Sequence, residues 1–267
     1  MNAFYKNFKK GFENLAFKHG YYQVFENFLD CAINSFSFNY SPEIMESIRK
    51  RYNEEERQIF GQLIFDWIKC QNEEIKTENC WFDFFGHFYE ENAISKQKGF
   101  AQYFTPPTIC NFMVKILDPT EKESIAEPAC GSGRFNLAVH AQNPKLFHHA
   151  NDLDFTCVKM AALNFMVHGI KGVVTCEDTL NIPGATFRSA FIVNDTIAPY
   201  LHYTENYTFT NNYLRSKINP NSKSIQQIEE VKKILDSKPL QDVIIEKLAG
   251  EIPPKEILNE LGQLSLF

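Results

Sequence analysis

A short segment near the middle of the chain, EPACGSGRF at residues 127–135, has the residue types of a ligand-binding turn. Gly131 and Gly133 lack a Cβ atom, so the backbone there can approach a bound molecule closely. An amphipathic run follows the segment, and the first N–H groups of a helix beginning there would be free to bind a ligand. Taken alone, the segment is better explained as an ordinary turn between a strand and a helix.

Two acidic residues shift that balance toward a nucleotide site. In nucleotide-binding sheets an acid at the end of the second strand, about 20 residues after the glycine turn, binds the ribose. Asp152 has this position, and Asp178 follows the next expected strand, where it could accept a hydrogen bond from an adenine amino group. Either residue alone is more simply explained as a helix N-cap. Both of them, together with the turn, favour a nucleotide site.

The elements that would position these residues begin near residue 99. A helix is expected from residue 107 or 108 to Asp118, and strands then alternate with helices. The expected strands are 124–129, 147–152, 172–177 and 190–194, and the expected helices are 133–142 and 154–169. This alternation is typical of an α/β fold with a parallel sheet covered by helices. After Tyr200 the pattern predicts no further strand: a polar, turn-prone stretch leads to helices at about 222–236, 238–248 and 253–261.

The first part of the chain is expected to be helical. Phe4, Phe8 and Phe12 recur at helical spacing, and the aromatic segment 81–91 is interpreted as core of these helices rather than as a base-stacking surface. The resulting domain prediction is a helical N-terminal domain, an α/β domain and a helical C-terminal region, at 1–98, 99–205 and 206–267.

Composition limits the classes of function. The formal net charge of −6 argues against nucleic-acid binding by the whole surface, although a local basic face is compatible with it. The seven cysteines form no Cys-x-x-Cys pair, so neither a zinc site nor a redox motif is predicted, and free thiols are expected. The N-terminus does not resemble a secretory signal and no run is apolar enough for a membrane span, so a cytoplasmic location is expected.

Four segments together resemble a known family, the adenine-specific DNA methyltransferases that serve as modification (methylase) subunits of type I restriction systems. The segments are AQYFTP at 101–106 (with Ala101 where glycine is usual), EPACGSG at 127–133, Asp152 with NFMVHG at 164–169, and DTL at 178–180. The match covers about residues 81 to 195. It implies a Rossmann-type methyltransferase sheet preceded by a helical domain.

The resemblance also implies S-adenosylmethionine as the cofactor and methyl donor. Phe104, Thr105 and Pro106 would line its methionine side, Asp152 would bind the ribose hydroxyls, and Asp178 would bind the adenine amino group. The cofactor-binding residues implied in full are Phe104, Thr105, Pro106, Glu127, Pro128, Ala129, Gly131, Gly133, Asp152 and Asp178.

The implied reaction is methylation of the exocyclic amino group of adenine in DNA, for which the base must leave the duplex stack. The family carries Asn/Asp-Pro-Pro-Tyr/Phe after the fourth strand, whereas this chain has NDTIAPY at 194–200. If Asn194 is aligned with the Asn/Asp of the family motif, both prolines of the motif are missing. If Pro199 and Tyr200 are aligned with the end of the motif, Ile197 stands at the Asn/Asp position, and its side chain cannot accept a hydrogen bond. The catalytic candidates are therefore Asn194, Pro199 and Tyr200, which would have to converge across a widened loop.

A second departure concerns length, because such a sheet normally continues for three more strands and only 67 residues follow Tyr200. The hypothesis is a truncated, diverged methyltransferase, a pseudoenzyme candidate that keeps the donor site while catalysis is impaired or lost.

Two other interpretations stay open. The last five residues, Gln263, Leu264, Ser265, Leu266 and Phe267, resemble the peptide that binds the bacterial sliding clamp, with a glutamine for polar contacts and a Leu-Phe pair for an apolar pocket. A DNA-associated adaptor recruited to the clamp is therefore the alternative, and an apolar tail packed on its own domain is the simpler explanation of the peptide. A specificity subunit, or a partner chain that completes the sheet, is the third possibility.

Overall fold

The computed structural model describes residues 2–37, 39–76, 80–92, 103–121, 123–195 and 199–218. Those up to Lys217 belong to one compact unit. The helices predicted at 222–236, 238–248 and 253–261 lie outside the described residues, as does the peptide 263–267. In the part described, no helix combines the length and the apolar character needed to cross a bilayer. All seven cysteines are free.

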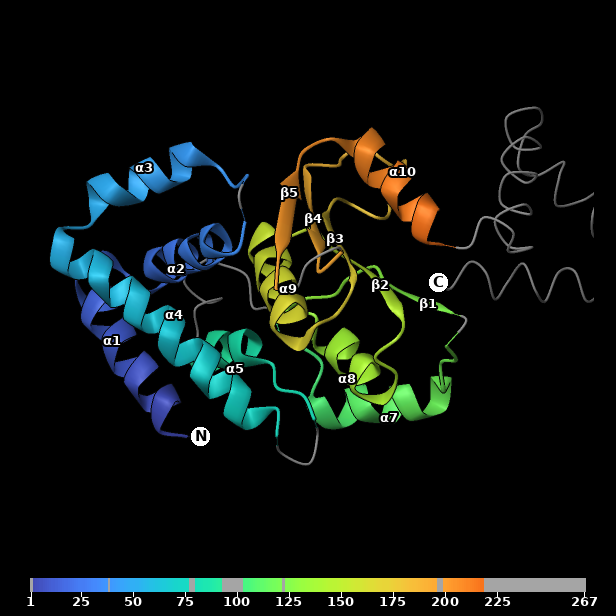
Figure 1. The fold of residues 1–267 in the computed structure, drawn as a ribbon, viewed down its shortest axis with the longest axis horizontal. Coiled ribbons are helices and arrows are strands. Elements are labelled where there is room, and N and C mark those ends of the chain that lie inside the picture. Colours follow the sequence, from blue (N-terminus) through green and yellow to red (C-terminus); the bar gives the residue numbers. More distant parts are fainter. Residues whose placement is uncertain are drawn as a thin grey trace, which may run out of the picture. The chain divides into compact units, whose positions relative to one another are not determined.

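The N-terminal part is helical, as predicted (Figure 1). Its helices are α1 (Ala3–His19), α2 (Tyr21–Ser35), α3 (Pro42–Arg51), α4 (Glu54–Glu74) and α5 (Phe84–Glu91). Local sequence sets where they begin: Asn53 and Glu56 form a capping box at α4, and Asp83 caps α5 by accepting the N–H of Gly86.

Aromatic side chains fill the core of these helices. Phe8 contacts Phe84 edge to face, with 4.8 Å between ring centroids, and contacts Phe88 in the same way at 5.0 Å. In the aromatic segment, Phe84, Phe85, Phe88 and Tyr89 are fully buried. The interpretation of residues 81–91 as helix core is therefore confirmed.

A five-stranded sheet follows, in the spatial order β1-β2-β3-β4-β5. Its strands are β1 (Ser124–Glu127), β2 (Phe147–Asp152), β3 (Gly172–Cys176), β4 (Ser189–Val193) and β5 (Leu201–Thr204). The first four match the predicted strands to within two residues at each end, and the α/β class is confirmed. The prediction that no strand follows Tyr200 is wrong. β5 has only four residues and one fully buried side chain, Leu201, so it carries no apolar run by which to recognise it.

The predicted parallel arrangement holds only for β1, β2 and β3. β4 pairs antiparallel to β3, with Val193 opposite Gly172 and Ser189 opposite Cys176, and β5 returns antiparallel to β4. The physical reason lies in the connection: residues 177–188 contain no α-helix, and a parallel return requires a crossover that is usually helical.

Helices α7 (Pro107–Leu117), α8 (Arg134–Gln142) and α9 (Phe155–His168) confirm the three helices predicted around the sheet. α10 (Tyr207–Lys217) lies in the stretch that the sequence analysis interpreted as turn-prone. α9 lies between the N-terminal helices and the sheet (Figure 1), and every residue from Thr156 to Met166 is buried. One hydrophobic cluster consequently includes residues of both the helical part and the sheet.

Candidate functional site

The glycine turn joins β1 to α8 and depends on both of its glycines. Gly131 has a φ of +54° and Gly133 a φ of +83°, which is the left-handed region that glycine adopts without strain. A Cβ atom at Gly131 would lie 2.7 Å from Cδ1 of Phe104, closer than the ring permits. A Cβ atom at Gly133 would lie 3.2 Å from Cε1 of Phe165. Gly131 therefore allows Phe104 to pack on the turn, and Gly133 allows α8 to begin close to α9.

A pocket of about 280 Å³ lies at this turn, where β1 ends at Glu127 and β2 ends at Asp152. This volume is near the lower limit of ligand sites, which span roughly 300 to 1,000 Å³. Its lining residues are Tyr103, Phe104, Thr105, Met113, Glu127, Ala129, Cys130, Gly131, Arg134, Phe135, Asp152 and Cys157. The structure thus brings together most of the predicted cofactor-binding residues, from three separate segments of the sequence.

The two carboxylates give the pocket its electrostatic character. Asp152 Oδ2 accepts the N–H of Gly131 at 2.9 Å, and Oδ1 accepts the N–H of Asp154 at 2.8 Å. Burial raises the pKa of Asp152, and these backbone hydrogen bonds partly offset that rise. Burial also raises the pKa of Glu127, and the nearby charge of Asp152 adds to the effect. Two acids at the ends of adjacent strands provide acceptors for hydroxyl groups and a negative field for a cationic ligand.

Some of the predicted cofactor residues do not line this pocket. Pro106, Pro128 and Gly133 flank it, and Asp178 has a local role. The Asp178 Oδ1 atom accepts the N–H of Leu180 at 3.0 Å, and the Asp178 N–H donates to Thr186 Oγ1 at 3.0 Å. Asp178 therefore closes the turn after β3, where it is neither a pocket residue nor the helix N-cap of the simpler interpretation, because no helix follows this strand.

The predicted catalytic residues lie at the other end of the sheet. Because β4 runs antiparallel to β3, Val193 lies beside the first residue of β3, and Asn194 follows it there. Glu127 and Asp152 are at the opposite, carboxyl ends of β1 and β2. Among the described residues, the predicted catalytic and cofactor-binding residues therefore do not form a single site.

Asn194 is buried and fully engaged in local hydrogen bonds. Its Nδ2 lies 3.2 Å from the carbonyl oxygens of Phe165 and Met166 and 3.0 Å from that of Ile170, at the end of α9. Its Oδ1 accepts the Tyr200 N–H at 3.2 Å, and its own N–H donates to the Tyr200 carbonyl at 3.0 Å. Asn194 and Tyr200 do converge, but at the end of α9. Ile197 lies outside the described residues.

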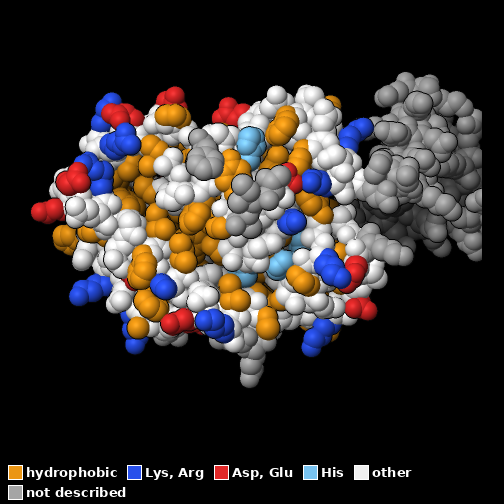
Figure 2. Space-filling view, in the orientation of Figure 1, with side chains coloured by type: hydrophobic (Ala, Val, Ile, Leu, Met, Phe, Trp, Pro, Cys, Tyr) orange, Lys and Arg blue, Asp and Glu red, His pale blue; other side chains and the backbone are white. Residues whose placement is uncertain are grey.

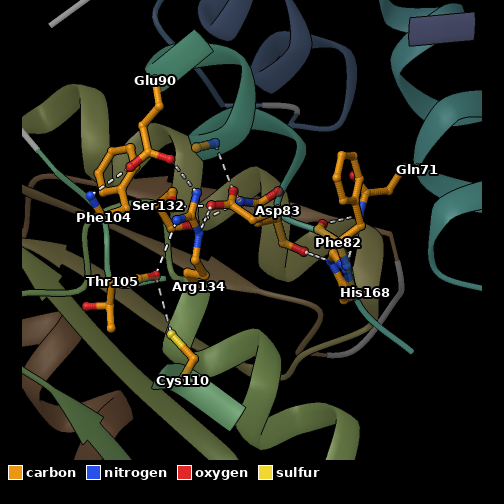
Figure 3. Close-up of polar contacts among 12 residues, drawn as sticks. Gln71, Phe82, Asp83, Glu90, Phe104, Thr105, Cys110, Ser132, Arg134 and His168 are labelled. Atoms are coloured by element: carbon orange, nitrogen blue, oxygen red, sulfur yellow. Dashed lines mark hydrogen bonds and ion pairs between the residues drawn. The ribbon is translucent and has the colours of Figure 1, made fainter. Parts of the chain in front are cut away.

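A polar network that no sequence pattern indicated lies beside the pocket (Figure 3). Asp83, at the start of α5, accepts hydrogen bonds at Oδ2 from Arg134 Nε at 2.8 Å and from Ser132 Oγ at 2.6 Å. Its Oδ1 accepts from Asn164 Nδ2 at 2.8 Å. The available signals were an acid that opens an aromatic helix and an arginine directly after the second glycine, neither of which indicates its partner.

His168 completes this network from α9 (Figure 3). Its Nδ1 lies 2.7 Å from the carbonyl oxygen of Asn164, and its Nε2 lies 3.3 Å from the N–H of Phe82 and 3.0 Å from Gln71 Nε2. Nδ1 therefore donates and Nε2 accepts, which is the neutral tautomer. Burial lowers the pKa of His168 to about 4. The Asn and His of the segment NFMVHG thus join α9 to α4 and to the start of α5.

Residues 81–233 match the N-6 DNA Methylase family. The methylase subunit of the type I restriction enzyme MjaVIII from Methanocaldococcus jannaschii is 28% identical over 96 residues, which is 33% of this chain and 16% of that protein. The methylase subunit of the type I restriction enzyme HindI from Haemophilus influenzae is 31% identical over 99 residues, 33% of this chain and 22% of that protein. The aligned region spans less than a quarter of either relative's length. Since the family match covers more than half of the chain, this protein belongs to the N-6 DNA methylase family.

Proposed function

We propose that this chain binds S-adenosylmethionine in the pocket at the glycine turn, as the donor-binding part of a methyltransferase that acts on adenine in DNA. The observation that carries the proposal is the convergence of Phe104, Glu127, Gly131 and Asp152 on one pocket. These residues come from the segments in which the chain resembles its family. In this proposal the parallel strands β1, β2 and β3 are the Rossmann-type unit of the fold.

The chemistry of the pocket fits this ligand. Asp152 would accept hydrogen bonds from the ribose hydroxyls, and the negative field of Glu127 and Asp152 would favour the positive sulfonium. Phe104 and Thr105 would cover the methionine side, and the missing Cβ atom of Gly131 leaves room for the Phe104 ring. When bound, S-adenosylmethionine supplies an electrophilic methyl group.

We further propose that this chain alone transfers methyl groups weakly or not at all. The supporting observation is the placement of Asn194, which is only 2% exposed and whose side-chain amide is occupied by α9 and Tyr200. This favours a donor-binding chain that acts with a partner, either a complementing or specificity subunit or, through Gln263 to Phe267, a sliding clamp. Pull-down of the sliding clamp by the full chain and by a chain lacking the last five residues tests whether this peptide binds the clamp. Equal capture by the two chains, or no capture by either, would overturn the clamp interaction.

Isothermal titration calorimetry with S-adenosylmethionine tests the donor site. We expect saturable binding by the wild type and a loss of at least tenfold in affinity for Asp152→Asn, because one charged acceptor for the ribose is removed. Asp178→Asn is the matched control: it makes the same chemical change at a strand end outside the pocket and is expected to bind nearly as the wild type does. Wild-type protein that gives no saturable heat would overturn the proposal.

Transfer of a labelled methyl group to DNA of varied sequence tests the second part. The expected result is little or no incorporation by this chain alone. Robust incorporation that Asn194→Ala abolishes would contradict the inactive interpretation while leaving donor binding intact.

A further inference from the structure

We propose that Arg134, held by Asp83 and Glu90, is a positioning residue that sets Phe104 and Thr105 against the glycine turn, so that helix α5 is a working part of the donor site. The inference rests on the proposed function, because the pocket it concerns is the one assigned to S-adenosylmethionine. It assigns a role in ligand binding to residues from the N-terminal helical part of the chain.

The strap, defined as residues 103–106, has no regular secondary structure of its own. The N–H of Phe104 donates to Glu90 Oε1 at 3.0 Å, and the carbonyl oxygen of Thr105 accepts from Arg134 Nη1 at 3.2 Å. The Arg134 guanidinium carbon also lies 5.6 Å from the centroid of the Phe104 ring. These two contacts of the strap backbone lead to α5 or to the arginine that α5 holds (Figure 3). The strap is also anchored to the start of α7, where the Thr105 carbonyl oxygen lies 3.6 Å from Cys110 Sγ and the Pro106 carbonyl oxygen accepts two backbone N–H groups.

Asp83 fixes the orientation of the arginine. The Arg134 and Asp83 side chains are 7% and 3% exposed, and Arg134 Nε lies 2.8 Å from Asp83 Oδ2. Ser132, Asn164 and the N–H of Gly86 occupy the remaining acceptor positions of that carboxylate. A buried guanidinium paired in this way has a fixed orientation, so its Nη1 atom can donate to the carbonyl oxygen of Thr105 in the strap.

Glu90 connects the arginine to the strap. One oxygen, Oε2, lies 3.0 Å from Arg134 Nη2, and the other, Oε1, accepts the Phe104 N–H. The Glu90 side chain is 33% exposed, unlike Asp83 and Arg134. It can therefore be shortened without leaving a fully buried cavity, which makes it the better residue for mutation.

A purely structural role for this network is the competing explanation, since buried polar networks also stabilise folds. The two explanations differ in one respect. A structural role predicts changes in stability that follow the number of bonds removed, whereas a positioning role predicts a change in donor affinity and in the local order of the strap.

The test compares Glu90→Ala with Glu90→Gln in the full chain, with S-adenosylmethionine as the titrant. The alanine variant loses both acceptors, while glutamine retains the Oε1 acceptor for the Phe104 N–H. We expect about tenfold weaker binding for Glu90→Ala and a smaller loss for Glu90→Gln, which keeps one acceptor but presents an NH2 group instead of an acceptor to Arg134 Nη2. Hydrogen exchange at the Phe104 amide should be faster in Glu90→Ala than in the wild type, and close to wild type in Glu90→Gln.

Glu121→Ala is the control, because Glu121 pairs with Lys145 at the surface, where the two side chains are 63% and 67% exposed. It should bind the donor as the wild type does. If Glu90→Ala does not fold, Arg134→Lys is the variant to test. Lysine keeps a positive charge beside Asp83 but lacks the second guanidinium nitrogen that reaches Thr105, so weaker binding of S-adenosylmethionine is again expected.

Equal donor affinity in wild type and Glu90→Ala, or in Arg134→Lys if that variant is used, would overturn the inference. A loss in Glu121→Ala as large as that in Glu90→Ala would overturn it as well. Absence of binding by the wild type would instead overturn the proposed function, and with it the ligand on which this inference rests.

Discussion

Phe104 and Gly131 form the contact on which the shape of the pocket at the glycine turn depends. The ring packs so closely on the turn that a Cβ atom at residue 131 would lie 2.7 Å from Cδ1 and 2.9 Å from Cε1. Gly131 also has a positive φ, which residues other than glycine adopt only at a cost in free energy. Steric room and backbone conformation therefore both require glycine here.

Gly131→Ala is accordingly expected to weaken donor binding by at least tenfold, because the new methyl group must displace Phe104 or the turn. Calorimetry with S-adenosylmethionine measures the change. Gly61→Ala is the control: this glycine lies in α4, exposed and with open space around its Cβ position, so alanine there should leave affinity unchanged and add up to about 1 kcal/mol to stability. Wild-type affinity in Gly131→Ala would contradict this account of the turn.

Sequence reasoning could place Gly131 and Asp152 because their spacing is local and their role follows a known strand order. It could not place Asp83, whose partners Ser132 and Arg134 lie 49 and 51 residues further along the chain. An isolated acid before an aromatic run indicates a helix cap, which Asp83 also is. Its second role depends on tertiary packing, which no local pattern encodes.

At the scale of elements, the direction of β4 decides where Asn194 lies. The absence of a helix between residues 177 and 188 is visible in the sequence, and it was sufficient to predict an antiparallel return. The first four expected strands were correct, but the parallel assignment rested on the alternation of strands and helices, and that alternation ends at β3. The structure instead uses Asn194 as a donor to the free carbonyl groups at the end of α9.

Asn194→Ala should therefore lower the free energy of unfolding by about 1 to 3 kcal/mol, because buried carbonyl groups lose their donor. The affinity for S-adenosylmethionine should stay at the wild-type value. Chemical denaturation and calorimetry measure the two quantities. Asn143→Ala provides a comparison: Asn143 ends α8 and donates to one carbonyl, that of Pro119, so its loss should be smaller. A large fall in donor affinity with unchanged stability would contradict the structural role of Asn194.

At the scale of the whole molecule, the helical part and the sheet are joined by buried charge as well as by a shared core. Lys159 in α9 lies 2.7 Å from a Glu26 carboxylate oxygen and 2.8 Å from Asp30 Oδ1, both in α2. On the face shown in Figure 2, basic side chains of the described residues are interspersed with acidic ones. The net charge of −6 of the whole chain supports the proposal that any action on DNA requires a partner.

In the proposed function, the pocket between the strap, the glycine turn and Asp152 binds S-adenosylmethionine. The most direct measurement is a crystal structure of the chain grown with saturating S-adenosylmethionine. We expect density for the ligand at this pocket, with the ribose hydroxyls within hydrogen-bonding distance of Asp152 and the Phe104 ring against the ligand. Ligand density at any other site, or an empty pocket at saturating concentration, would contradict the claim.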